Sequence, residues 1–506
     1  MTKNTKLVLG FILLLALIIR VFRLTSIPPG LNQDEAVNGY DAYSLETTLR
    51  DHHGNFLPIM LQSFDDWTSP LITYITIPFV KNFGLSLFSV RIVAVMLGVG
   101  SIFLLYLFLK QITKKQEMAL LGAFLLAISP WHITLSRWAI PPSTVTFFLL
   151  LFLWSFFWTI EKSQKNKSIW LFIIPGITGG ILTYSYPTLK LFGPLFVFFL
   201  ALIYLRTNLK GAVIFLASLA ILISPIYLLT ITDGKYNARF AGVSGLTETN
   251  AKKEILSRYT DYFLPHFQFQ SGDTDAMHQV PGFGNSDIFL SVFFYSGILI
   301  SVLGLFKVIK IPNIGVKTYL MLLTWLLLFP IAASLTKDRN MVLRVVQGLP
   351  LVVIFSIISM TFGLQFIKKT YTSFLIAIVV AISLINFGKF SRYYFTQYPD
   401  LVYRQYQYGM KEIMKYLLKN QDKFDKVIID NNINQPYIYY LFYSSFDPKK
   451  LDYKNPKLSD PKYVYETVSR EIVAELPCVL EVAYKDTSPR LGICTKDRIW
   501  YVKQYY

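Results

Sequence analysis

Long stretches of apolar residues without charged side chains are the feature that most constrains this chain. Each is close to the ~20 residues that an α-helix needs to cross the hydrocarbon core of a membrane. Only 16% of the residues are charged, whereas soluble domains contain about a quarter. The sequence therefore predicts a polytopic α-helical membrane protein with about 11 transmembrane helices, at 7–19, 88–109, 117–133, 143–160, 169–185, 188–205, 211–231, 287–306, 318–335, 346–366 and 371–388.

The first apolar stretch has two interpretations. Residues 7–19 are flanked by basic residues, as in a signal peptide, but no small-residue cleavage pattern follows them, so we interpret the stretch as a retained helix. A further apolar segment, Leu71–Val80, is too short to cross a membrane and has prolines at its edges. We expect it to lie in the membrane interface or to re-enter the membrane.

Basic residues predict the orientation of the chain. With a cytoplasmic N-terminus, the loops on the inner side carry many lysines and arginines and almost no acid, which is the positive-inside pattern. The loops at 25–87, 232–286 and 334–345 and all residues after Gly388 then lie on the outer side of the plasma membrane. This distribution explains the net charge of +18 without a nucleic-acid partner.

The last part of the chain differs from the rest. We predict a transmembrane domain over 1–388 and a small extracytoplasmic α/β domain over 389–506. Charges occur throughout this second domain, with expected helices near 403–420 and 435–443 and strands at 426–430, 478–484 and 491–494. Its residues Cys478 and Cys494 are the only cysteines; on the oxidising side a disulfide is allowed, and two unpaired thiols are the alternative.

Acidic residues of the membrane portion are concentrated in the outer loops. The predicted spans contain almost no acid, whereas transporters place ionisable groups at mid-membrane depth. A loop just above the bilayer can instead hold a carboxylate over a substrate that arrives from the membrane. The first outer loop contains seven acidic residues, namely Asp34, Glu35, Asp41, Glu46, Asp51, Asp65 and Asp66.

The most distinctive part of this loop is the segment Pro28-Pro29-Gly30-Leu31-Asn32-Gln33-Asp34-Glu35. It leaves the first helix through a proline turn and then presents two adjacent carboxylates, which point in different directions in a helix or a strand. One can face a substrate while the other holds the loop. The ordinary structural interpretation is a helix start, because acids in a first turn interact favourably with the helix dipole.

Several segments carry a resemblance to a known family. The run PPGLNQDEAVNGYDAYSL, followed by GNFLPIMLQSFDDWTSPLITYITIPFVKNFG and SVRIVAVMLG, resembles bacterial membrane glycosyltransferases of the GT-C class that are related to protein O-mannosyltransferases and lipid A aminoarabinose transferase. SPWHITLSRWA, TYSYPTLK, HQVPGFG and SLTKDRNMVLR are also similar to that group. The resemblance covers most of the chain, and its most specific part is the Asp-Glu pair directly after the first span.

The resemblance implies transfer of a sugar from a polyprenyl-phosphate carrier to a lipid, glycan or protein acceptor on the outer face. Phosphate departs without protonation, so such an enzyme needs one carboxylate base and cations for the phosphate. It implies Asp34 as the general base, with inversion, and Glu35 as the residue that orients the loop or the sugar. Asp65 and Asp66 match a second acidic position, and Asp66 is our choice for a substrate contact; solvated loop acids are the alternative.

Three basic residues at the outer ends of spans are the candidates for phosphate binding: Arg137, Lys190 and Arg344. Related proteins commonly have a basic residue after the second acid, where this chain has Trp67, so the phosphate contact must come from elsewhere. Snorkelling side chains are the alternative. We assign no role to His278. No histidine pair has the spacing of a zinc site, so we expect no required metal or cofactor, although oxygen ligands for a divalent ion leave little trace in a sequence.

Two other functional classes share these features. A lipid or sugar transporter would explain the spans, and a non-catalytic scaffold would explain the outer domain. Among enzymes, an oligosaccharide ligase with a diphosphate-linked donor needs the same topology. Activity that survives Asp34→Asn would favour the transporter or the scaffold over the glycosyltransferase.

Overall fold

The computed structural model describes residues 2–64, 66–166, 168–270, 272–423, 426–430, 434–466, 479–481, 490–491 and 499–502. These residues form two compact units. Unit 1 comprises 1–22, 94–137 and 141–394, and unit 2 comprises 23–93, 138–140 and 395–506. The second unit therefore joins the first outer loop to the C-terminal segment, two regions far apart in the sequence. The domain boundary that the sequence predicts at residue 388 stays a prediction.

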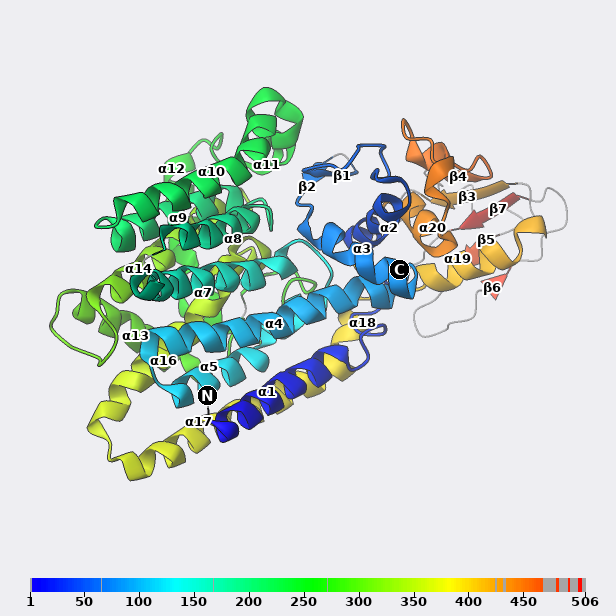
Figure 1. Cartoon of the computed structure of the whole chain (residues 1–506). Coiled ribbons are helices and arrows are strands. Elements are labelled where there is room, and N and C mark those ends of the chain that lie inside the picture. The colour runs from blue at the N-terminus through cyan, green and yellow to red at the C-terminus, as the bar shows by residue number, and fades with distance from the viewer. Residues whose placement is uncertain are drawn as a thin grey trace. The chain divides into compact units, whose positions relative to one another are not determined.

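Apolar helices make up unit 1 (Figure 1). Among the described residues seven helices are long and apolar enough to cross a membrane and four more are shorter; together they overlap all the predicted spans. The polytopic helical membrane fold is thus confirmed. Its helices are α1 (Lys3–Val21), α4 (Leu87–Thr113, which begins in unit 2), α5 (Gln116–Ala127), α7 (Pro142–Asn166), α8 (Ile173–Thr183), α9 (Leu189–Leu205), α10 (Leu209–Thr232), α13 (Leu290–Leu305), α14 (Val316–Leu328), α16 (Leu349–Gly363) and α17 (Lys369–Thr396).

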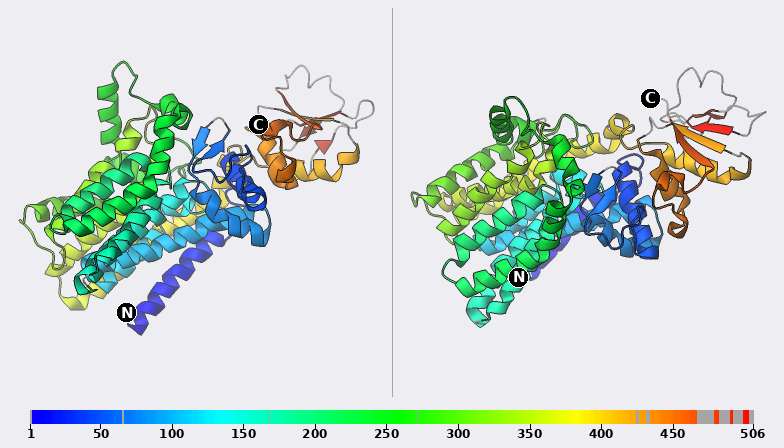
Figure 2. Two further views of the ribbon diagram at one scale, coloured as in Figure 1. Left: turned by 45° about the horizontal axis from the view of Figure 1, so that its top comes forward. Right: turned by 90° about the horizontal axis from the view of Figure 1, so that it is seen from above.

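Short helices complete unit 1 between the long ones. They are α6 (Pro130–Leu135), α11 (Ala238–Val243), α12 (Ala251–Asp261) and α15 (Ile331–Ser334). Small residues allow close packing: a Cβ at Gly297 of α13 would collide with the carbonyl oxygen of Phe355 in α16, as expected where helices meet without a hydrophobic driving force between them. Figure 2 shows the long helices of unit 1 beside one another in two further views.

Unit 2 contains the first outer loop and the C-terminal α/β segment. From the loop come α2 (Gln33–Thr48), the paired strands β1 (Leu61–Ser63) and β2 (Asp66–Thr68), and α3 (Leu71–Phe83). Helix α3 coincides with the apolar segment that was too short to cross, and it packs against α2. The C-terminal segment adds α18 (Tyr398–Val402), α19 (Met410–Lys419) and α20 (Pro436–Ser444).

The C-terminal strands form one five-stranded sheet with the order β4-β3-β7-β5-β6 (Figure 1). Strands β4 (Tyr463–Glu466), β3 (Lys426–Asp430), β7 (Ile499–Val502) and β5 (Val479–Glu481) are parallel, and β6 (Arg490–Leu491) is antiparallel to β5. Strand β3 lies where the sequence predicts it, and β5 and β6 overlap the two later predictions only in part. Cys478 and Cys494 lie outside the described residues, so their pairing stays open.

A shared apolar core holds the two parts of unit 2 together. Helix α2 contributes Val37 and Tyr40, and α20 contributes Ile438 and Leu441, all of them buried. A Cβ at Gly39 would clash with Val90 and Phe442, so the crossing of α2 and α20 requires a residue without a side chain. The hydroxyl of Tyr40 also donates to the carbonyl oxygen of Phe446 at 2.8 Å. The first outer loop and the C-terminal segment therefore fold as one body.

Candidate functional site

Helix α2 begins with a capping box at the end of the proline turn. The side-chain Oδ1 of Asn32 accepts from the amide of Asp34 at 2.9 Å, and Oε2 of Glu35 accepts from the amide of Asn32 at 3.3 Å. Both acids lie in the first turn, where the helix dipole favours negative charge. The ordinary interpretation of this segment as a helix start is therefore correct, and it is compatible with a chemical role for one of the two acids.

The two adjacent carboxylates have opposite environments. Glu35 is fully buried, whereas Asp34 is exposed. Oε1 of Glu35 accepts from Nε of Arg91 at 2.8 Å and from the amide of Ala139 at 3.1 Å, and its Oε2 accepts from Nη2 of Arg91 at 2.8 Å. Successive helix positions point about 100° apart, which separates the two roles. Glu35 is buried and bonded to Arg91 and Ala139, and Asp34 is exposed.

Arg91 holds the turn that precedes α2. Besides Glu35, its guanidinium donates to the carbonyl oxygens of Leu24 at 3.1 Å, Pro28 at 2.8 Å and Gly30 at 2.9 Å. A guanidinium has five N–H donors, and these contacts use all of them. Because Arg91 is fully buried, the Glu35 carboxylate is its necessary counter-charge. Together the two side chains fix the backbone from residue 24 to residue 35.

Sequence reasoning missed Arg91, because the residue falls inside the apolar stretch 88–109. A signal was present: a basic residue within the first turns of a predicted span is costly in lipid and usually pairs with a nearby acid. The segment SVRIVAVMLG contains it. The pairing partner, 56 positions away in the sequence, could not be read from that pattern.

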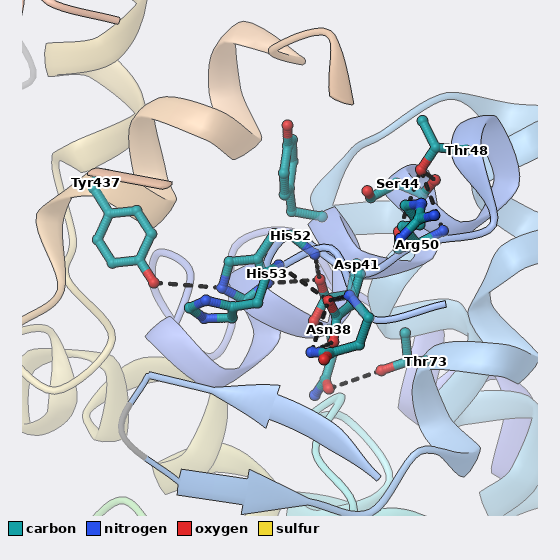
Figure 3. Close-up of polar contacts among 12 residues, drawn as sticks. Asn38, Asp41, Ser44, Thr48, Arg50, His52, His53, Thr73 and Tyr437 are labelled. Atoms are coloured by element: carbon teal, nitrogen blue, oxygen red, sulfur yellow. Dashed lines mark hydrogen bonds and ion pairs between the residues drawn. The ribbon is translucent and has the colours of Figure 1, made fainter. Parts of the chain in front are cut away.

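A second buried polar group lies farther along the same loop (Figure 3). Nδ1 of His52 contacts Oδ1 of Asp41 at 2.7 Å, and the amide of His52 donates to the same oxygen at 2.8 Å. Both side chains are fully buried. On the other side of the ring, Nε2 of His52 lies 3.4 Å from the hydroxyl of Tyr437 in α20. This chain of contacts connects α2 to the C-terminal segment.

Two residues beside this pair, Asp51 and His53, have pKa values that differ from their ordinary ones. Burial raises the pKa of Asp51 to about 6, and Asp41 contributes in the same direction. Burial lowers the pKa of His53 to about 3, and the charge of His52 adds to this effect. For His52 itself, burial would lower the pKa, but the Asp41 carboxylate outweighs burial and raises it.

These shifts predict how the Asp41–His52 pair responds to pH. Because the pKa of His52 is raised in the folded state, the pair contributes its full stability below the unfolded value of about 6.5 and loses it as the pH rises through the folded value. We expect Asp41→Asn to lower the melting temperature of the purified protein at pH 6, with a smaller decrease at each higher pH. A decrease that is constant from pH 6 to pH 10 would contradict an ionised pair; Glu46→Gln, in the same helix, is the control.

Of the other acidic candidates, Asp66 lies in the short hairpin of unit 2. Asp66 is the first residue of β2, and its Oδ1 accepts from the amide of Trp67 at 2.7 Å. Asp65 lies outside the described residues. The structure thus places Asp34, Glu35 and Asp66 in the same unit, and a substrate contact by Asp66 stays a prediction.

The three basic candidates all belong to unit 1. Arg137 is fully buried, and its guanidinium donates to the carbonyl oxygens of Ile19 at 2.9 Å, Arg20 at 2.6 Å and Phe22 at 2.9 Å. This arrangement satisfies the C-terminal carbonyls of α1, where a positive charge is favoured by the helix dipole. The contacts of Arg137 therefore point to a structural role.

Lys190 and Arg344 are more accessible than Arg137. Lys190 is half-buried in the first turn of α9. The guanidinium of Arg344 donates to Thr336 and, at 2.6 Å, to Asp338, and 11% of its side chain is exposed. Nearby in the sequence, Arg339 pairs with Glu254 and Asp261. Phosphate binding by Lys190 or Arg344 stays a prediction.

His278 also has a defined partner in unit 1. Its Nδ1 lies 3.0 Å from Oδ2 of Asp273, an oxygen that also accepts from the amide of Val342. Burial would lower the pKa of His278, but Asp273 outweighs it and raises the pKa. No group of three metal-ligating side chains occurs in the described part of the chain. The expectation that no metal is required stays a prediction.

Comparisons with known proteins bear on the fold and the family. Residues 10–236 match the family model of dolichyl-phosphate-mannose-protein mannosyltransferases. A putative mannosyltransferase, YkcB of Bacillus subtilis, is 29% identical over 150 residues, which are 29% of this chain and 20% of that protein. The predicted resemblance to this group is confirmed, and the matched segment contains the whole first outer loop.

Solved structures of low sequence identity share the fold. ArnT from Cupriavidus metallidurans, solved with undecaprenyl phosphate, is 10% identical, with a TM-score of 0.53 over 92% of this chain and 89% of that one. The oligosaccharyltransferase of Archaeoglobus fulgidus, solved with a tethered acceptor peptide, is 13% identical, with a TM-score of 0.51 over 88% of this chain and 63% of that one. The chain thus has the GT-C membrane fold. It spans most of ArnT, but less than two thirds of the oligosaccharyltransferase and a fifth of YkcB.

Proposed function

From this GT-C fold and the mannosyltransferase family match, we propose that the chain transfers a monosaccharide from a polyprenyl-phosphate donor to an acceptor on the outer face of the membrane. Asp34 is the general base, and the anomeric centre is inverted. The observation that carries the proposal is the contrast at the start of α2: Asp34 is exposed, while Glu35 beside it is fully buried on Arg91. The buried Glu35–Arg91 pair fixes the backbone of the turn and so holds the neighbouring base, Asp34, in one position.

The proposed chemistry needs few groups. The carboxylate of Asp34 accepts the proton of an acceptor hydroxyl, whose oxygen attacks the anomeric carbon while the bond to the phosphate oxygen breaks. Because phosphate is a stable anion, no general acid is needed, and cations only have to neutralise its charge. Arg344 is the first choice for that contact and Lys190 the second. Glu35 keeps the turn in place, and Asp66 contacts the sugar or the acceptor.

Two cavities in unit 1 support a lipid-linked donor. One, of about 420 Å³, is lined almost entirely by apolar side chains of α5, α13, α16 and α17, including Phe293, Met360 and Ile378. The other, of about 340 Å³, is also lined by residues of α13 and α17 and includes the polar residues Asp287 and Asn386. An apolar cavity suits an isoprenoid chain, and a cavity with polar groups suits a polar head.

The acceptor that we propose is a lipid, a glycan or a protein of the cell envelope, and no nucleic acid takes part. The solved relatives contain a polyprenyl phosphate in one case and an acceptor peptide in another. From the positive-inside pattern of the loops, we propose that the N-terminus is cytoplasmic and that unit 2 lies outside. In that position both the proposed base and the C-terminal segment face the outer surface of the plasma membrane.

The orientation predicts which positions react from outside the cell. With Cys478 and Cys494 replaced by serine, a cysteine at Asn250 should react with a membrane-impermeant maleimide in intact cells. A cysteine at Thr207 should react only after permeabilisation, although both residues are exposed. Labelling of Thr207→Cys in intact cells, with Asn250→Cys protected, would reverse the proposed topology.

The decisive experiment for the function uses purified full-length protein in detergent. Radiolabelled polyprenyl-phosphate mannose, glucose and arabinose are offered separately, with membrane extract as the acceptor, and transferred label is counted. We expect transfer from one of the three donors. A parallel reaction with a diphosphate-linked oligosaccharide tests the ligase: transfer only from that donor, or from none by folded protein, would contradict the proposal.

A further inference from the structure

A polar cavity of about 590 Å³ lies in unit 2, behind the proline turn that leads to Asp34. Its volume is within the roughly 300–1,000 Å³ typical of ligand pockets. The cavity is lined by Ile27, Pro29 and Gly30 of the turn and by residues of α18, α19 and α20. None of the residues that we assign to the catalytic site or to phosphate binding lines it.

The side chains that line this cavity combine charge of both signs with aromatic rings. They are Arg23, Asp400, Tyr408, Lys411, Glu412 and Tyr443. The charges of the two basic and two acidic groups cancel, so the cavity has no excess of positive charge that would bind a phosphate. Tyrosine rings beside carboxylates and ammonium groups suit a neutral, hydroxyl-rich ligand, because sugar C–H faces pack on rings while the hydroxyls donate to carboxylates and accept from cations.

Two of these groups are available for such a ligand. Lys411 and Glu412 lie in the first turn of α19, and neither side chain makes a hydrogen bond or an ion pair with another described residue. Lys411 is exposed and Glu412 is half-buried. The ammonium group of Lys411 can therefore donate hydrogen bonds to a ligand, and the carboxylate of Glu412 can accept them.

Tyr443 of α20 lines the cavity, as do Ile27, Pro29 and Gly30 of the proline turn. Burial raises the pKa of the Tyr443 hydroxyl; the charges of Glu412 and Glu35 raise it further, and Arg91 acts in the opposite direction. A ligand in the cavity would rest against the same backbone that carries the proposed base.

We propose that this cavity binds a sugar unit of a glycan acceptor. The inference rests on the proposed function, since it names the class of acceptor that the transferase uses. The donor is placed elsewhere by its chemistry: its isoprenoid chain needs the apolar cavities of unit 1, and its phosphate needs an excess of positive charge, which this cavity lacks. The proposed function leaves a lipid, a glycan or a protein open as the acceptor, and the lining of this cavity favours the glycan.

Binding can be measured without any donor, which separates this proposal from the proposed function. Saturation-transfer NMR is recorded on the full chain in detergent with maltose and with methyl mannoside as probes, and inorganic phosphate is added as a competitor. We expect a saturable signal from at least one sugar that phosphate does not displace. Displacement by phosphate, or no signal from either sugar, would overturn the proposal.

Variants then locate the bound sugar. Glu412→Gln and Tyr443→Leu should each weaken sugar binding about tenfold or more, the size expected when a hydrogen bond to a charged group or a stacking contact is lost. Lys454→Ala, which removes an exposed lysine elsewhere in unit 2, should leave it unchanged. Tyr443 is half-buried, so Lys411→Gln on the exposed first turn of α19 provides a second test that does not depend on packing. Unchanged binding in both Glu412→Gln and Lys411→Gln would overturn the proposal.

The source of the sugar is decided by kinetics. If the cavity serves the acceptor, the free sugar that binds best inhibits transfer competitively with the glycan acceptor and not with the lipid-linked donor. Competition with the donor alone would show that the cavity holds the donor sugar and would overturn the assignment. If Asp34→Asn retains transfer while the sugar still binds, the proposed base is wrong and the cavity assignment stands.

Discussion

Replacing Asp34 with asparagine is expected to reduce sugar transfer by roughly 10²–10⁴-fold, the range that a general base contributes. The change keeps the size and shape of the side chain and removes only its ability to accept a proton. Because Asp34 is exposed, the protein should fold as the wild type does. Transfer is measured from the lipid-linked donor identified above, at saturating donor and acceptor.

The control for this experiment is Glu46→Gln, in the last turns of the same helix, where the carboxylate pairs with Lys81 at 3.2 Å on the surface. An exposed ion pair of this kind contributes at most about 1 kcal/mol, so the variant should transfer sugar at the wild-type rate. Equal losses in both variants would indicate a general effect of charge in the loop. An Asp34→Asn protein as active as the wild type would rule Asp34 out as the base.

The largest effect on stability is expected for the Glu35–Arg91 pair. Removing one partner of a fully buried ion pair leaves the other charge unpaired and costs about 3–5 kcal/mol. Glu35→Gln and Arg91→Met should therefore each lower the melting temperature of the protein strongly and reduce transfer. Arg91→Met also leaves the carbonyl oxygens of Leu24, Pro28 and Gly30 without their donor, so it should be the more damaging of the two.

The double variant tests whether Glu35 and Arg91 stabilise the protein as a pair or independently of one another. If the two side chains stabilise the protein through one another, Glu35→Gln/Arg91→Met will be destabilised by clearly less than the sum of the single changes. Additive losses in the melting temperature would contradict the pairing. A double variant that recovers stability but not transfer would show that the geometry of the turn matters to catalysis beyond its stability.

The pattern of apolar residues was enough to predict most of the fold. Each predicted span overlaps a helix, because the membrane requires ~20 apolar residues per crossing and leaves that requirement in the sequence as an uninterrupted run. The helices and the first strand of the C-terminal segment were found by the same kind of local periodicity. The later strands were placed less well. Strands β5 and β6 have three and two residues, too few positions for an alternation to be recognised, and β4 and β7 were not predicted.

The candidate site was predicted in part. The Asp-Glu pair was recognised from its position after the first span, and the helix that it starts has both the capping and the dipole interactions that a first turn suggests. Two alternatives for Glu35, a contact to the loop or to the sugar, were open in the sequence. The side chain is fully buried, and Arg91 and the amide of Ala139 donate to its carboxylate, which favours the loop. The contacts of Arg137 with the end of α1 were not foreseeable, because backbone carbonyls have no signature in a sequence.

What the sequence by itself determined is therefore the class of protein, the course of the spans and the position of the acidic turn, since each depends on local composition that the membrane or a helix terminus imposes. Only the tertiary structure decided that Arg91 braces Glu35, that His52 joins Asp41, and that the first outer loop and the C-terminal segment share a core. These contacts join residues up to 406 positions apart. Their partners are selected by burial and by complementary charge, which act through space and not along the chain.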